Sequence, residues 1–81
     1  MTILPKQSRA ARGLLDWTIA DLANASSLGL STVKNFENSR RDTTTANLIA
    51  IRRALEDAGV EFIPAKSGKG VGVRLREDQE Q

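Results

Sequence analysis

The apolar residues between positions 18 and 38 fall into two short sets with helical spacing. The sets are Ile19, Leu22 and Ala23, and then Leu30, Val33 and Phe36. Residues three or four apart lie on one face of an α-helix, and residues 26–29 between the sets leave room only for a tight turn. Thr18 suits the N-cap of the first helix and Gly29 that of the second. The pattern predicts a helix-turn-helix at 18–38, with two helices that cross steeply over a small core.

A further helix is expected on the N-terminal side of this motif. Pro5 is well suited to the first turn of a helix, because its missing N–H has no helical partner there. The helix should run from Pro5 or Lys6 to Leu15, after a loose arm at 1–4. Its buried residues are predicted to be Ala11, Leu14 and Leu15, with Trp17 closing the corner that follows.

A fourth helix should follow the motif. It is expected to start near Thr44, capped by one of three consecutive threonines, and to end near Ala58, where Gly59 is a suitable C-terminal residue. Its apolar stripe consists of Leu48, Ile51, Leu55 and Ala58, with Ile49 beside it. Four helices over about 5–58 therefore form the predicted core.

After Gly59 the apolar period changes from helical to two. Residues 60–63 predict a short strand, 64–70 a turn, and 71–76 a second strand that alternates apolar residues with Gly or Arg. Two strands alone are marginal in water, so the apolar side of this β-hairpin, over about 60–76, should cover the helices or a second subunit. Residues 77–81 read as a solvated acidic tail. The predicted fold class is mainly α, as a single domain over 1–81 with a C-terminal β-hairpin.

Composition argues against an enzyme. The 81 residues contain no Cys and no His, which removes thiolate chemistry, the commonest catalytic base and the commonest metal ligand. Gly68–Gly72 superficially resembles a nucleotide-binding loop, but the strand–loop–helix context is missing. We expect no enzymatic activity, no metal and no cofactor.

The charge distribution favours a nucleic-acid surface on the N-terminal half. The net charge is +2, but residues 1–41 hold six basic and three acidic side chains, whereas residues 42–81 hold six basic and seven acidic. The basic excess thus accompanies the helix-turn-helix. No apolar run is long enough to span a membrane and no leader resembles a signal peptide, so we expect a cytoplasmic protein without membrane contact.

From about Gln7 to Leu55 the chain resembles the DNA-binding domain of lambda-repressor-like regulators of the Cro/C1 type (XRE family). The residues that match the family pattern are Ala23 at the helix crossing, the apolar Leu28, Val33 and Phe36, Glu37 after Phe36, and the basic loop residue Arg41. The chain departs from the pattern at three positions. Ser27 replaces the usual turn glycine, so the turn must hold a non-glycine residue in a left-handed conformation or adjust. Gly29 replaces a Ser or Thr cap, and Ile19 replaces a Gln that often faces DNA.

The resemblance implies a DNA-binding surface on the second helix of the motif, lying in the major groove of double-stranded DNA. The implied base-reading residues are Leu30, Ser31, Thr32, Lys34 and Asn35; for Ser31 and Thr32, a role in merely starting and coating the helix is nearly as good an explanation. The implied phosphate contacts are Thr18, Asn38, Arg40 and Arg41. It also implies an ion pair between Arg12 and Glu37, whereas Lys6 and Arg9 are expected on a solvated face.

Two functions remain open. The first is a transcriptional regulator that acts as a repressor and binds a palindromic operator as a homodimer. Its predicted dimer interface consists of Val60, Phe62, Ile63, Val71, Val73 and Leu75. The second is a protein-binding helix-turn-helix that caps a partner, as an antiactivator or antitoxin does, without binding DNA. The low net charge and the apolar Ile19 and Leu30 favour this alternative.

Overall fold

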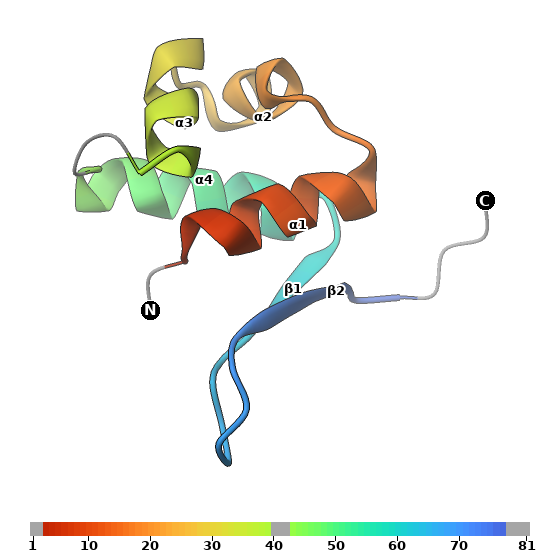
Figure 1. The fold of residues 1–81 in the computed structure, drawn as a ribbon. Helices are drawn as coiled ribbons and strands as arrows, with labels where there is room; N and C mark the ends of the chain where they lie inside the picture. The colour runs from red at the N-terminus through yellow and green to blue at the C-terminus, as the bar shows by residue number, and fades with distance from the viewer. Residues whose placement is uncertain (1–2, 40–42, 78–81) are drawn as a thin grey trace.

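The structure, a computed structural model, describes residues 3–39 and 43–77 of the chain. Its elements in order are α1 (Pro5–Leu15), α2 (Ile19–Ser26), α3 (Leu30–Glu37), α4 (Thr45–Asp57), β1 (Val60–Ile63) and β2 (Gly72–Leu75) (Figure 1). The predicted fold class, mainly helical with a C-terminal hairpin, is confirmed. Each predicted helix agrees with the observed one to within a residue at either end.

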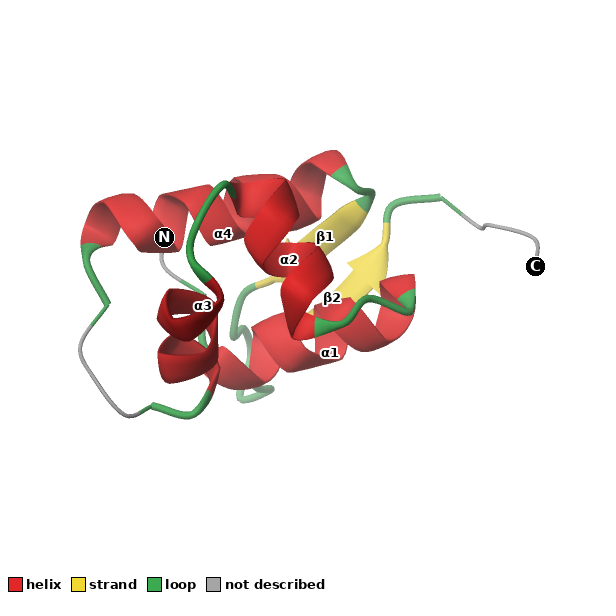
Figure 2. Cartoon of the chain, turned by 90° about the horizontal axis from the view of Figure 1, so that it is seen from above, coloured by secondary structure: helices red, strands yellow, loops and turns green. Residues whose placement is uncertain are grey.

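The helices α1 and α4 separate the helix-turn-helix from the hairpin. In Figure 1, α2 and α3 lie above α1 and α4, and the hairpin extends below them. Seen from above in Figure 2, α2 and α3 lie over α1 and α4, with the strands beneath. The helix α1 contacts α3, α4 and both strands, and α4 contacts α2 and β1. Through this arrangement α1 touches both the motif and the hairpin.

The core gathers one apolar face from each helix, as the spacing predicts. Its members are Ile3, Ala11, Leu22, Ala23, Val33, Phe36, Ile51, Ala54, Leu55, Val60 and Phe62. Two expectations for the N-terminal region were wrong. Ile3, placed in a loose arm, is only 3% exposed and joins the core, since an apolar side chain next to the helices gains by leaving water. Leu14, expected to be buried, is 39% exposed, because α1 turns Gln7, Ser8 and Ala11 inward instead.

The helix ends follow the expected capping chemistry. The hydroxyl oxygens of Thr18 and Thr44 accept hydrogen bonds from the N–H groups three residues later, so Thr44 is the capping threonine of the three. The turn between α2 and α3 keeps its shape with Ser27 in the left-handed conformation, at φ 60°. This is the first of the two outcomes expected where the usual glycine is missing. After α4 the same role falls to Gly59, at φ 109°.

The hairpin closes on the helices of its own chain. Its strands pair antiparallel with Phe62 opposite Val73 and Val60 opposite Leu75, and these four side chains pack against the helical core. On the outer side, Arg74 forms an exposed ion pair with Glu61, which lowers the pKa of Glu61 through hydrogen bonding and charge. The Gln7 side chain donates to the Gly72 carbonyl at 3.1 Å, joining α1 to β2.

The tip of the hairpin is tighter than the loop predicted for residues 64–70. Lys66 and Lys69 exchange two backbone hydrogen bonds, which leaves only Ser67 and Gly68 at the turn. Both have positive φ, 55° and 79°, as a two-residue hairpin turn of this kind requires. The two lysines therefore flank a compact turn on the side away from the helix-turn-helix (Figure 1).

The burial of Ile3 can be tested by truncating its side chain. We expect Ile3→Ala to lower the free energy of unfolding by about 2–4 kcal/mol, because the cavity left in the core collapses only partly. The neighbouring Leu4 is exposed, so Leu4→Ala should change it by less than about 0.5 kcal/mol. Urea denaturation followed by circular dichroism measures both. Equal, small effects of the two substitutions would mean that residue 3 belongs to a loose arm after all.

Candidate nucleic-acid interface

The helix α3 presents two different faces. One face packs into the protein through Val33, Phe36 and Glu37. The opposite face carries residues at the i, i+4 spacing that aligns side chains along a helix, namely Leu30, Ser31, Lys34, Asn35 and Asn38. Of these, only Asn35 is half-buried and the others are exposed, Leu30 by 53%. Thr32 is also half-buried and lies further round the helix, next to Val33. The predicted base-reading residues thus gather on one side of α3, with Thr32 at its margin.

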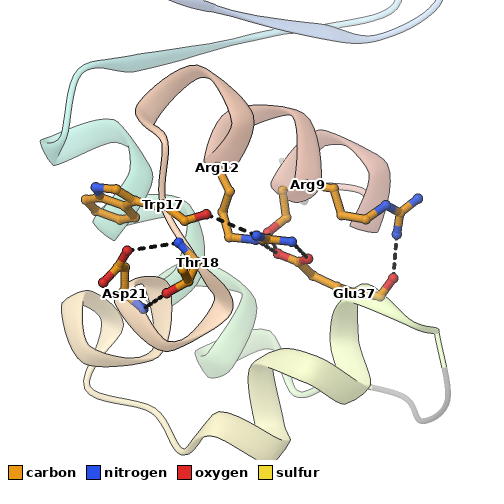
Figure 3. Close-up of polar contacts among 7 residues, drawn as sticks. Arg9, Arg12, Trp17, Thr18, Asp21 and Glu37 are labelled. Carbon is orange, nitrogen blue, oxygen red and sulfur yellow. Dashed lines mark hydrogen bonds and ion pairs between the residues drawn. The ribbon is translucent and has the colours of Figure 1, made fainter.

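The last residue of α3 places a carboxylate inside the protein. Glu37 is 2% exposed, and its Oε1 and Oε2 accept from Arg12 Nη2 at 2.6 Å and from Arg12 Nε at 2.9 Å (Figure 3). Ser8, which is also buried, donates its hydroxyl to Oε2 at 2.6 Å. This is the ion pair that the resemblance implies, with an additional donor. Among the described residues no buried side-chain N or O atom lacks a hydrogen-bond partner, so the buried charge is fully satisfied.

The same arginine also ties down the corner between α1 and α2. Arg12 Nη1 donates to the backbone carbonyl of Trp17 at 3.1 Å, directly before the residue that caps α2. The hydrogen bonds and the charge of Glu37 raise the pKa of Arg12 above its ordinary value, so the guanidinium stays charged at every physiological pH. One side chain therefore links α1, the start of α2 and the end of α3.

Arg9 lies on the exposed side of α1, as expected, but it also has a partner in the protein. Its side chain is exposed, but Nη1 donates a hydrogen bond to the backbone carbonyl of Glu37 (Figure 3). Lys6, one turn earlier, is exposed as expected. Sequence reasoning missed both Ser8 and Arg9 as partners of Glu37. A usable signal was present, because Ser8 and Arg12 share one face of α1 at i, i+4 spacing, and a buried Glu37 needs more than one donor.

The structure describes two of the four residues predicted to contact phosphates. Thr18 lies at the N-terminus of α2, where its N–H donates to Asp21 Oδ2 at 2.9 Å and its hydroxyl oxygen accepts from the Asp21 N–H at 3.1 Å (Figure 3). This reciprocal capping box is typical of a helix start. Asn38 caps the C-terminus of α3 and is exposed. The other two predicted contacts, Arg40 and Arg41, lie outside the described residues.

The predicted dimer residues lie mostly on the inner side of the hairpin. Val60 is 0% and Phe62 6% exposed, so their side chains cover the helices of their own chain and have almost no surface left for a second subunit. Val73 and Leu75 are half-buried against the same core. Ile63 is half-buried on the outer side of the hairpin, and Val71, just before β2, is exposed. The apolar side of the hairpin is therefore covered by the helices of the same chain, which was one of the two arrangements expected.

The apolar patch that motivated a protein partner is smaller than expected. Ile19 is half-buried and packs against the core, which leaves Leu30 as the exposed member of the patch.

In the part of the chain that the structure describes, no group of His, Cys, Asp or Glu side chains could hold a metal ion. None of the described helices is long and apolar enough to cross a membrane.

The sequence of α1 to α4 matches a known family. A family model described as Helix-turn-helix matches residues 9–56, from the second turn of α1 almost to the end of α4. The chain belongs to this family, the lambda-repressor-like DNA-binding regulators of the XRE type, in agreement with the resemblance seen in the sequence. No curated protein matches the chain significantly. The hairpin lies outside the matched residues.

Removing Arg12 should destabilise the fold strongly. Arg12→Ala leaves the buried Glu37 carboxylate without its main partner, and we expect a loss of about 3–5 kcal/mol in the free energy of unfolding. Arg74→Ala is the matched control, because it breaks a solvent-exposed ion pair that should matter little. Thermal and urea denaturation of both variants measure the difference. Similar midpoints for the two variants would contradict a structural role for the buried pair.

Proposed function

We propose that the protein is a sequence-specific transcriptional regulator that acts as a repressor, with α3 lying in the major groove of its operator. The observation that carries this proposal is the division of α3 into a fixed inner face and an exposed outer face. Lys34 can donate to guanine O6 or N7, and Asn35 can make a paired contact with adenine. Leu30 can pack on thymine methyl groups. A protein bound there excludes other proteins from the same DNA, which is sufficient for repression.

Phosphate contacts would hold α3 in register. Helix N-termini and short polar side chains commonly bind phosphates. Thr18 lies at the N-terminus of α2, and Asn38 offers an exposed side-chain amide after α3. Arg40 and Arg41 follow α3 in the sequence and would add cations beside the groove. The basic excess of residues 1–41 agrees with this assignment.

The proposed operator is palindromic, since the regulator would bind as a homodimer with one α3 in each of two successive major grooves. With Val60 and Phe62 buried, the surface proposed for a second copy lies at the start of β2, beside α1. A hollow between α1 and β2, lined in part by Ala10, Val71 and Val73, supplies exposed apolar area there. Ile63, also expected at the interface, lies on the outer side of the hairpin and could only contribute at the margin of this surface.

Selection from a randomised pool of DNA duplexes tests the DNA-binding proposal. We expect the wild-type protein to enrich one duplex and to bind it roughly a hundredfold more weakly when salt rises from about 50 to 200 mM, as release of about four counterions requires. Lys34→Ala/Asn35→Ala should weaken binding to this duplex by about a hundredfold, because both base contacts are lost. Fluorescence anisotropy measures each Kd.

A matched control removes two cations far from α3. Lys66→Ala/Lys69→Ala lowers the charge at the hairpin turn and should leave the Kd for the enriched duplex within about twofold of wild type. If the α3 variant and this hairpin variant weakened binding equally, the base contacts would have been assigned to the wrong surface.

The homodimer has a separate test. We expect a dimer at micromolar concentration by size-exclusion chromatography with light scattering, and a monomer for Val71→Asp, because a charge in an apolar interface loses its hydration. Ile49→Asp is the control, since Ile49 is exposed on α4, away from β2. A wild-type monomer with and without the enriched duplex would overturn the dimer proposal while leaving DNA binding intact.

The second candidate function is capture of a partner protein by the helix-turn-helix. The observation in its favour is Leu30, a large apolar side chain exposed at the start of α3. The two functions differ in what the selection experiment returns. Enrichment of no duplex, together with weak binding even at low salt, would favour the protein partner, with Leu30 in the contact.

A further inference from the structure

Three side chains on one turn of α1 converge on a single residue of α3. Ser8, which is buried, donates to the Glu37 carboxylate. Arg12 binds the same carboxylate, whereas the exposed Arg9 binds the Glu37 carbonyl (Figure 3). We propose that Arg9 is a positioning residue for the recognition helix: it sets the tilt of α3 and so the register of the base-reading side chains. This inference rests on the proposed function of α3 and adds a residue that does not itself read DNA.

The bond that Arg9 makes is suited to this task. Glu37 is the last residue of α3, so its carbonyl is one of those that have no partner within the helix. The carbonyl end of a helix also carries partial negative charge, which a guanidinium stabilises. Arg9 therefore satisfies a backbone acceptor and complements the helix dipole with the same group.

A small tilt of α3 about its C-terminus would displace its N-terminus by a large distance. The helix has eight residues and is about 12 Å long, so a tilt of about 10° about its C-terminus moves its N-terminus by about 2 Å. Hydrogen bonds to base edges tolerate only about 0.5 Å between their shortest and longest useful distances. Leu30 and Ser31, at the N-terminal end, would lose their contacts first.

The Glu37 carboxylate alone leaves this tilt undetermined. The bonds from Ser8 and Arg12 end at a side chain, which has rotatable bonds between its carboxylate and the α3 backbone. The bond from Arg9 ends at the backbone itself. With both in place, the last residue of α3 is held at two points on opposite sides, and the helix loses its freedom to rock over α1.

A direct phosphate contact by Arg9 predicts different behaviour. A cation that neutralises a phosphate contributes to every duplex alike and adds about 0.9 to the slope of log K against log salt. A positioning residue instead affects only the duplex whose bases are read, and leaves this slope unchanged. Affinity, selectivity and salt dependence together therefore distinguish the two roles.

The experiment compares Arg9→Ala, Arg9→Lys and the charge-matched control Lys66→Ala. The probes are the duplex enriched by the wild-type protein and a scrambled duplex of the same composition. For Arg9→Ala we expect binding to the enriched duplex to weaken by about tenfold, as the loss of one hydrogen bond from a charged donor allows. Binding to the scrambled duplex should stay within about twofold, with the salt slope unchanged. Arg9→Lys should recover part of the loss, and Lys66→Ala should match wild type.

A measurement without DNA separates folding from positioning. Amide hydrogen exchange of α3 should be faster in Arg9→Ala than in wild type or Lys66→Ala, whereas exchange in α4 should be unchanged. If Arg9→Ala proved too unstable, Arg9→Lys would carry the same comparison at unchanged charge.

Three outcomes would overturn the inference. Equal weakening on both duplexes, with a reduced salt slope, would make Arg9 a phosphate ligand. Wild-type affinity and exchange in Arg9→Ala would make its side chain simply solvated. Enrichment of no duplex by the wild-type protein would overturn the proposed DNA reading itself, and that result is recognisable before any variant is made.

Discussion

A buried carboxylate is the constraint on which the arrangement of the helices depends. A charge removed from water costs several kcal/mol unless donors surround it, and Glu37 at the end of α3 obtains its donors only when α1 crosses α3 at one position. Ser8 and Arg12 then meet the carboxylate, and Arg12 reaches the Trp17 carbonyl as well. Apolar packing of Val33 and Phe36 alone would tolerate small slides of α3 over α1. The ion pair with its short bonds does not, so it fixes where α1 crosses α3 and leaves the tilt of α3 to other contacts.

Periodicity predicted the elements because each depends on neighbours within a few residues. The two apolar sets, Thr18 and Thr44 as caps, and Gly59 after α4 act locally, so the fold class and helix ends could be read from the chain. The contacts that escaped prediction join segments far apart. Arg9 meets Glu37 across 28 positions, and the inward turn of Ser8 rather than Leu14 follows from where Glu37 lies. A one-dimensional pattern can show that Arg9 is on the surface, but not which backbone carbonyl comes within its reach.

The hairpin shows the same limit at a larger scale. Alternation along residues 71–76 identified the strand and its apolar side, yet a second subunit and the chain's own helices satisfy that pattern equally well. The position of the hairpin against the helices decides between them, because Val60 and Phe62 pack into the core of their own chain. The candidate site was easier to predict from the sequence, since once the buried residues of α3 are known, the remaining residues form its exposed face. Only its loop cations, Arg40 and Arg41, lie outside the described residues.

The division of α3 into two faces has a consequence for how such a regulator can change. The inner face of α3 holds the fold together, and the outer face is the one proposed to read DNA, so the two tasks fall on opposite sides of the same eight residues. The side chains of Leu30, Ser31 and Lys34 are exposed, so their replacement should leave the Glu37 anchor and the core intact. Under the proposed function, a few substitutions on the outer face of α3 would therefore give the domain a new DNA sequence preference without first requiring a more stable protein.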